Sequence, residues 1–240
     1  MALTLATVEI LRKLIATIPH RPLRMACAGY PDVLVAGEQI ATMFGAEVAA
    51  ATQARPDSDT ILRWDGLAGK IDQVAETKHF LSLLGIEATF FDIAQVRGDE
   101  IVQDLNVPLR PELEQKFDIV FDGGTMEHCF NVAQAIQNFL LMAKVGGYIV
   151  HSNPFNLPNH GFYNFNPTFY ADFYGDNGHE IIGDIAAYSS NVLSTSFAVV
   201  RKTDRFRSNL PEAALVVVAK KGNDRPPAWP MQTKYKKTQP

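Results

Sequence analysis

The segment 117–150 constrains the fold of this 240-residue chain more than any other. Its apolar run 119–121 is too short for a helix and stops at an acid and two glycines, 122–124, as expected where a buried parallel strand ends over a binding crevice. Apolar residues then recur at helical spacing, and two glycines, 146–147, precede another apolar run, 148–150. We therefore predict strand, loop, helix, turn and strand, one crossover unit of an α/β fold.

The residue identities in this segment and its neighbours are more specific than the pattern of apolar residues. Residues 117–120 read FDIV and residues 143–147 read AKVGG, which resembles the FDxV and LKPGG motifs of class I S-adenosylmethionine-dependent methyltransferases. The chain resembles a poorly characterised bacterial branch even more closely, and the likeness is strong over residues 85–185. The branch motifs found in this sequence are DLNxPL at 104–109, DGGTxEHxFN at 122–131 and HGFYxFxP at 160–167.

The resemblance implies an α/β fold with a Rossmann-like, seven-stranded sheet that is mostly parallel, has an antiparallel strand seven and carries helices on both faces. We place this domain at 23–221, after an N-terminal amphipathic helix in 1–22 and before a proline-rich extended tail at 222–240. Residues 33–84 exceed one crossover helix and form either a surface insertion or a cap over a substrate cavity. We expect two helices there, at 41–54 and 71–84, with a loop at 56–59. The predicted strands are 23–28, 88–91, 100–103, 119–121, 148–150, 180–187 and 213–220.

Composition limits the classes of partner. A formal charge of -4 gives no electrostatic footprint for nucleic acid. No apolar run approaches the about twenty residues that a membrane span needs, and charged residues interrupt the first helix, unlike a signal peptide. Cys27 and Cys129 offer no disulfide framework and lie in apolar surroundings. We expect a soluble, cytoplasmic protein without membrane or nucleic-acid partners; the sequence leaves open whether it forms a homo-oligomer.

Cofactor residues follow from the resemblance. Gly29 stands where this superfamily has a glycine-rich loop that admits the amino-acid part of S-adenosylmethionine; only this glycine remains, and Pro31 lacks an amide donor. Asp92, after the second strand, corresponds to the acid that accepts hydrogen bonds from both ribose hydroxyls. Asp104 and Leu105 correspond to the pair beside the adenine ring. An acid at a strand end is also an ordinary helix cap, and that interpretation stays open for both aspartates.

Catalytic candidates lie in two loops. Asp122, which the resemblance also places beside the cofactor, is expected to be exposed and to orient an acceptor. Glu127 and His128 follow it, and a histidine there can accept the departing proton, although both residues equally suit the bracing of a helix start. His160 and Tyr163 belong to an aromatic loop that would wall a small-molecule pocket. Packing of the later aromatics in a buried helix is the alternative for that loop.

A metal site is not expected. His128, Cys129, His151 and His160 could converge with Asp122, but they lack compact ligand spacing.

The function that follows is transfer of a methyl group from S-adenosylmethionine to an oxygen or nitrogen of a small-molecule acceptor. Two alternatives remain. The fold could have lost its cofactor and serve as a binding or assembly subunit, as the reduced glycine loop and the proline-rich tail suggest. The crevice could also serve another nucleoside or a sugar ligand.

Overall fold

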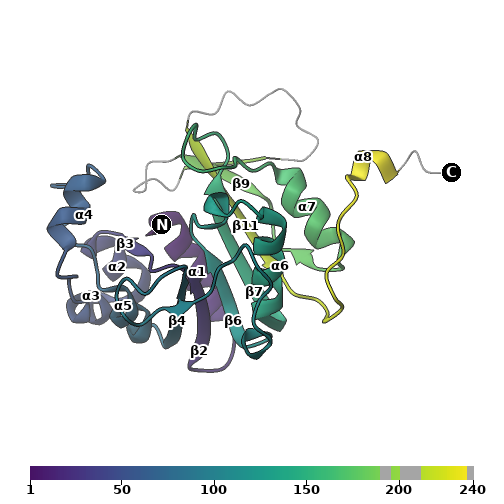
Figure 1. The fold of residues 1–240 in the computed structure, drawn as a ribbon. Coiled ribbons are helices and arrows are strands. Elements are labelled where there is room, and N and C mark those ends of the chain that lie inside the picture. The colour runs from purple at the N-terminus through teal and green to yellow at the C-terminus, as the bar shows by residue number, and fades with distance from the viewer. Residues whose placement is uncertain (190–195, 201–211, 237–240) are drawn as a thin grey trace. The chain divides into compact units, whose positions relative to one another are not determined.

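The computed structural model describes residues 1–189, 196–200 and 212–236, and its chain divides into two compact units (Figure 1). Among the described residues, the N-terminal unit comprises 1–102, and the C-terminal unit comprises 103–189, 196–200 and 212–236. Helices and strands alternate along both units, which confirms the α/β class. Within the described residues, no helix is long and apolar enough to cross a membrane.

The N-terminal unit contains three parallel strands, β2 (Leu23–Ala28), β4 (Ile86–Asp92) and β5 (Ile101–Val102), with β4 in the middle. Strand β2 has the predicted bounds, while β4 begins two residues before the prediction and β5 is shorter. The last four side chains of β2 are all buried, as expected for a strand covered on both faces. Both β2 and β4 lead toward the predicted cofactor residues of this unit, Gly29 and Asp92.

The amphipathic helix α1 (Leu5–Thr17) confirms the N-terminal prediction, and the Thr4 side chain caps its start by accepting from Thr7 N at 3.4 Å. A short strand before it, β1 (Ala2–Thr4), was not predicted. It pairs in parallel with β3 (Asp32–Leu34), directly after the loop that follows β2.

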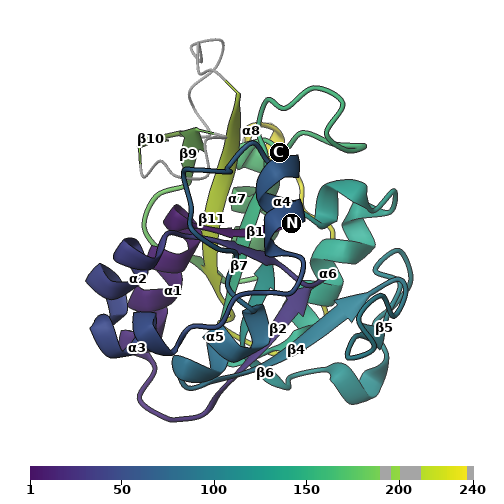
Figure 2. The same cartoon turned by 90° about the vertical axis from the view of Figure 1, so that its left-hand side faces the viewer.

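The segment 33–84 is divided more finely than the sequence predicted. Helices α2 (Gly37–Phe44) and α3 (Ala46–Ala51) come first, and Figure 2 shows α2 close to α1. Gly45, with φ of 96°, separates α2 from α3, so the predicted single helix over 41–54 is wrong. The predicted loop at 56–59 is wrong in its second half, because α4 (Ser58–Trp64) begins there. Five buried side chains form a core of this segment's own, at Leu34, Leu62, Leu67, Ile71 and Val74. The bounds of its helices are α2 (Gly37–Phe44), α3 (Ala46–Ala51), α4 (Ser58–Trp64) and α5 (Thr77–Leu83).

The C-terminal unit begins with the short 3-10 helix η1 (Pro111–Leu113) and then the predicted crossover. Strand β6 (Phe117–Asp122) is buried along its whole length and pairs in parallel with β7 (Ala143–Pro154). Helix α6 (Val132–Met142) connects them and buries the predicted apolar face. The glycines at 146–147 do not end the helix, however, because β7 already starts at Ala143 and contains them.

The remaining strands of this unit lie beyond β7. Strand β11 has the predicted bounds and runs antiparallel to β7, which confirms the predicted direction of strand seven. Predicted strand six is two short strands, β8 and β9, and both pair antiparallel with β11. Strand β10 lies beyond β9 and was not predicted, so the expected simple seven-strand pattern is not met. Their bounds are β8 (Glu180–Ile181), β9 (Ala186–Ser189), β10 (Phe197–Val199) and β11 (Ala213–Lys220).

The tail runs alongside helix α7 (Pro167–Asp176), as the yellow and green ribbons of Figure 1 show. Ala228 N donates to Asn177 Oδ1 at 2.6 Å, and Thr233 N donates to Asp172 Oδ2 at 3.0 Å. The tail is mostly irregular but includes the short helix α8 (Thr233–Lys236), so it is not wholly extended. Residues 190–195, 201–211 and 237–240 of the predicted connection and tail lie outside the described part of the chain.

Candidate functional site

Asp122, the last residue of β6, is the centre of a buried hydrogen-bond network in the C-terminal unit. Its Oδ1 accepts from the backbone N of Thr125 at 3.0 Å and of Met126 at 3.1 Å. Its Oδ2 accepts from His151 Nδ1 at 3.0 Å and from Asn153 Nδ2 at 2.9 Å. The parallel register places His151 directly opposite Asp122, so the sheet itself creates this contact. Asp122 is fully buried, and the expectation that it is exposed is wrong.

The network continues from Asp122 to two buried tyrosines. A carboxylate can only accept, so His151 carries its proton on Nδ1, and its Nε2 accepts from the Tyr174 hydroxyl at 2.6 Å. Asn153 Oδ1 accepts from the Tyr170 hydroxyl at 2.6 Å. Burial raises the pKa of both tyrosine hydroxyls well above the usual value, which keeps them protonated as donors. Neither tyrosine was among the predicted site residues.

Glu127 is held by this network and faces two histidines. Its Oε2 accepts from Asn153 Nδ2 at 3.0 Å, while Oε1 is buried without a hydrogen-bond partner. Oε1 lies 3.4 Å from His160 Nε2 and 4.0 Å from His128 Nε2. Burial, followed by the nearby charge of Asp122, raises the pKa of Glu127 to about 7. The structure therefore brings His128 and His160 together around a buried carboxyl group.

Backbone contacts explain how two distant loops meet. Glu127 and His128 lie in the short 3-10 helix η2 (Met126–His128), and Phe162 N donates to Glu127 O at 2.8 Å. A Cβ at Gly161 would lie 2.8 Å from the same Glu127 O, so only glycine permits this approach. The imidazoles of His128 and His160 stand 5.5 Å apart, centre to centre, and about half of each side chain is exposed. The glycine after His160 is the sequence signal that could have indicated this contact.

Tyr163 lies in the same aromatic loop but is tied to the backbone. Its hydroxyl donates to Phe130 O at 2.8 Å. Phe130 and Phe162 are both largely exposed, and their rings meet edge to face at 5.4 Å between centroids. This exposed aromatic pair belongs to the loops that carry His128 and His160, and the apolar wall expected from the sequence stays a prediction. The later aromatics, Phe165 and Phe173, are buried as packing residues.

The predicted adenine residues of the C-terminal unit lie in a tight local turn. Asp104 Oδ1 accepts from both the backbone N and the side-chain Nδ2 of Asn106, each at 2.8 Å, which makes a local turn and not the helix cap considered above. Leu105 is buried, and its carbonyl oxygen accepts from Asn138 Nδ2 at 3.1 Å. Asn138, which the sequence analysis missed, also accepts from Leu109 N at 3.0 Å and thereby ties the whole loop to α6.

In the N-terminal unit, Gly29 and Asp92 lie next to each other at the ends of β2 and β4. Gly29 has φ of 74°, which favours glycine, and a Cβ there would be 3.5 Å from Asp92 Oδ2. Asp92 Oδ1 accepts from Ile93 N at 2.7 Å. The Met1 side chain also contacts this place, because its Cε lies 1.7 Å from where a Cβ on Gly29 would be. Close approach to the Gly29 backbone and a carboxylate beside it fit a nucleoside cofactor, although Met1 shares that space.

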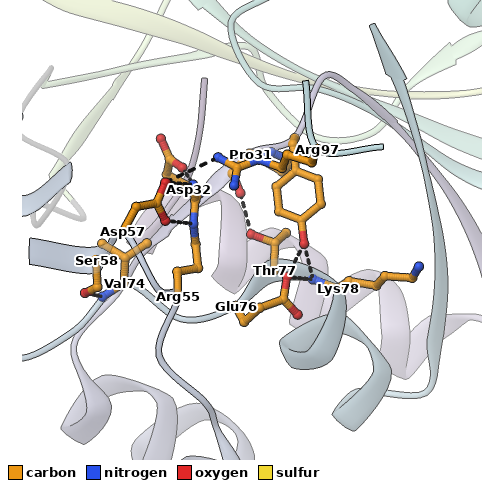
Figure 3. A network of polar contacts seen from close by, with 11 residues as sticks. Pro31, Asp32, Arg55, Asp57, Ser58, Val74, Glu76, Thr77, Lys78 and Arg97 are labelled. Atoms are coloured by element: carbon orange, nitrogen blue, oxygen red, sulfur yellow. Dashed lines mark hydrogen bonds and ion pairs between the residues drawn. The ribbon is translucent and has the colours of Figure 1, made fainter. Parts of the chain in front are cut away.

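A polar network that the sequence analysis missed follows Gly29 in the same unit. Figure 3 shows it around Arg55, whose buried guanidinium binds both carboxylate oxygens of Asp57, at 3.0 and 2.9 Å, and also bonds Asp32. This pairing holds the pKa of Asp57 below its usual value. Arg55 and Asp57 are thereby fixed to Asp32, the first residue of strand β3.

Tyr30, next to Gly29, belongs to the same network. Its hydroxyl donates to Glu76, and Arg97 Cζ stacks over its ring at 4.7 Å from the centroid. Glu76 also caps α5 by accepting from His79 N at 2.6 Å. The loop after β2 is therefore held by side chains in place of the missing glycine-rich turn.

No family model matches this chain, and no curated protein matches it significantly. Solved structures to which it is similar include several methyltransferases. The first is 1,6-didemethyltoxoflavin-N1-methyltransferase of Burkholderia thailandensis, with a TM-score of 0.48 and 12% identity over 91% of this chain and 78% of that one. A TehB-like SAM-dependent methyltransferase of Corynebacterium glutamicum gives 0.45 and 15% over 88% and 86%.

The CMeT domain of the citrinin polyketide synthase gives a TM-score of 0.49 and 11% identity over 92% of this chain, which spans 52% of that one. Identities this low with TM-scores below 0.5 do not establish the family of this chain.

Proposed function

We propose that this protein is an S-adenosylmethionine-dependent methyltransferase that acts on an oxygen or nitrogen of a small-molecule acceptor. The observation that carries the proposal is the arrangement of the C-terminal unit, where antiparallel β11 lies between β7 and β9. This is the strand-seven placement implied by the sequence resemblance. The three branch motifs, at 104–109, 122–131 and 160–167, all lie in the same unit.

In this proposal each predicted cofactor residue keeps the role that the sequence resemblance implies. Asp92 offers two acceptor oxygens for the ribose hydroxyls, and Gly29 beside it, which has no Cβ, would admit the amino-acid part once the Met1 side chain turns away. Asp104 and Leu105 would bind the adenine. When bound, S-adenosylmethionine supplies a methyl group that its sulfonium already activates, so the protein mainly aligns the nucleophile and takes up a proton.

The acceptor is proposed to bind at the loops that carry His128 and His160. Each imidazole is about half exposed, so a nitrogen can reach an acceptor hydroxyl or amine and take its proton. Tyr163 and the Phe130–Phe162 pair would form the apolar wall. Asp122 is buried and fully occupied by hydrogen bonds, so its proposed role is to position the loop through Thr125 and Met126.

Calorimetric titration with S-adenosylmethionine and S-adenosylhomocysteine tests the cofactor. We expect micromolar binding that weakens at least about tenfold in Asp92→Ala, since the substitution removes a double acceptor. The matched control is Asp99→Ala, an exposed acid of the following loop that pairs with Lys78, and its affinity should equal that of the unchanged protein. Absence of heat with both ligands, together with no thermal stabilisation, would refute the proposal.

One observation favours a second candidate, a binding subunit without catalysis. The Met1 side chain lies over Gly29, and Pro31 lacks an amide hydrogen. This candidate predicts no saturable cofactor binding and the recovery of a stable partner with the protein. The same titration therefore separates the two candidates.

A further inference from the structure

Three potential metal ligands meet in the C-terminal unit. Glu127, His128 and His160 each offer one ligand atom, and these atoms lie within 4.8 Å of one another. Two neutral imidazoles and one carboxylate form a ligand set that suits divalent first-row transition metals.

An independent observation at Glu127 points to a ligand. Its side chain is fully buried, yet Oε1 has no hydrogen-bond partner and is directed toward the two imidazoles. A buried carboxylate oxygen without a partner is unfavourable, because it has lost its hydrogen bonds to water. A cation at this point would satisfy that oxygen.

The surroundings of Glu127 have the features of a second coordination shell. Asn153 donates to its other oxygen, Oε2, at 3.0 Å, and Tyr170 fixes Asn153 in turn. Phe162 N holds the loop that carries His160 against Glu127 O at 2.8 Å. Such partners fix the orientation of a ligating carboxylate before the ion arrives.

We propose that Glu127, His128 and His160 bind one divalent transition-metal cation of the Zn²⁺, Co²⁺ or Ni²⁺ type. Metal–ligand bonds of about 2.1 Å place ligand atoms about 3.0–3.4 Å apart. The present Oε1–Nε2 distances are 3.4 and 4.0 Å, so the half-exposed imidazoles close the shell by small side-chain rotations. The three ligands leave further coordination positions open for water or for an acceptor oxygen or nitrogen. The site does not rest on the proposed methyl transfer, because its test measures ion binding alone. An ion bound to both Nε2 atoms would leave neither nitrogen free to take a proton from the acceptor, so it would replace that role of the histidines.

Binding of the metal alone tests this site. Untagged protein is freed of metal with a chelator and dialysed, and Zn²⁺ is then titrated in competition with a chromophoric chelator. We expect one ion for each chain and a dissociation constant in the micromolar range or below. His128→Ala and His160→Ala should each weaken Zn²⁺ binding at least about tenfold. Loss of a residue that only orients a ligand weakens metal binding by about 10–100-fold, and loss of the ligand itself should weaken it no less. His20→Ala, an exposed histidine of the N-terminal unit, is the matched control and should leave the affinity unchanged.

Co²⁺ gives a second readout that does not depend on activity. Its visible absorption bands should appear in the unchanged protein and in His20→Ala, and they should be lost or shifted in His128→Ala, His160→Ala and Glu127→Gln. The two histidine variants change half-exposed side chains, so they decide the matter even if Glu127→Gln does not fold. Uptake of less than one ion for each chain, or equal affinities in the histidine variants and the control, would overturn the proposal.

Discussion

Replacement of Asp122 by asparagine should test the network on which the candidate site is built. The amide oxygen of Asp122→Asn can still accept from Thr125 N and Met126 N, but its NH₂ group replaces the oxygen that now accepts from His151 and Asn153. His151 can respond by moving its proton from Nδ1 to Nε2, because the Tyr174 hydroxyl can accept as well as donate.

Asn153 cannot respond in this way. Its Nδ2 also donates to Glu127, and its Oδ1 accepts from Tyr170, so turning the amide would break both bonds. Two buried donors then face each other where a bond to a charged group existed. Hydrogen bonds to charged groups contribute about 1.5–3 kcal/mol, and a buried unsatisfied group costs about 1–3 kcal/mol. With one bond recovered through His151, we expect the free energy of unfolding to fall by about 2–4 kcal/mol.

Urea unfolding followed by circular dichroism measures this change. Asp104→Asn is the matched control, because the Asp104 oxygen that accepts from Asn106 is retained as an amide oxygen. We expect the control to lose less than about 1 kcal/mol. Nitrogen chemical shifts of His151 should also report the change of tautomer. Equal losses in the two variants, or an unchanged His151 tautomer in a protein that stays fully stable, would contradict this account of the network.

Three further predictions concern the stability of the two units. Burial and the nearby cations Lys221 and Arg225 lower the pKa of His179 to about 4. The neutral imidazole therefore contributes to the free energy of unfolding above pH 6.5, and this contribution is lost as the pH falls toward 4. We expect this loss to be about 3 kcal/mol and to be absent from the urea unfolding of His179→Asn. Gly161→Ala should lower the unfolding free energy by about 1–3 kcal/mol through its clash with Glu127 O, whereas Gly175→Ala, which has open space around it, should be neutral or stabilising; thermal unfolding compares them. Arg55→Lys keeps the charge but loses the forked pair with its aspartates, and we expect thermal unfolding to show a loss of about 2 kcal/mol, with no change contradicting a structural role.

The sequence was most informative where local pattern decides structure. Strands β2 and β11 have the predicted bounds, since each contains an uninterrupted apolar stretch, at 25–28 and 213–219, and such stretches occur where strands are buried on both sides. Prediction was poorest in the segment 33–84. The helix predicted at 41–54 breaks at Gly45. The positions of this segment's helices depend on a small core of the segment's own and on the contacts of Arg55, and helical periodicity indicates neither.

The same division applies to the candidate site. The sequence alone identified Asp122, His128 and His160 as polar residues in loops that follow strands. Only the tertiary structure buried Asp122 in the register of β6 and β7, and only it placed His160 beside Glu127 across 33 positions of chain. Strand and helix patterns record which face of an element is buried, whereas contacts between distant loops depend on how those elements pack. The sequence therefore determines which side chains are available, and the packing of the elements determines which of them come into contact.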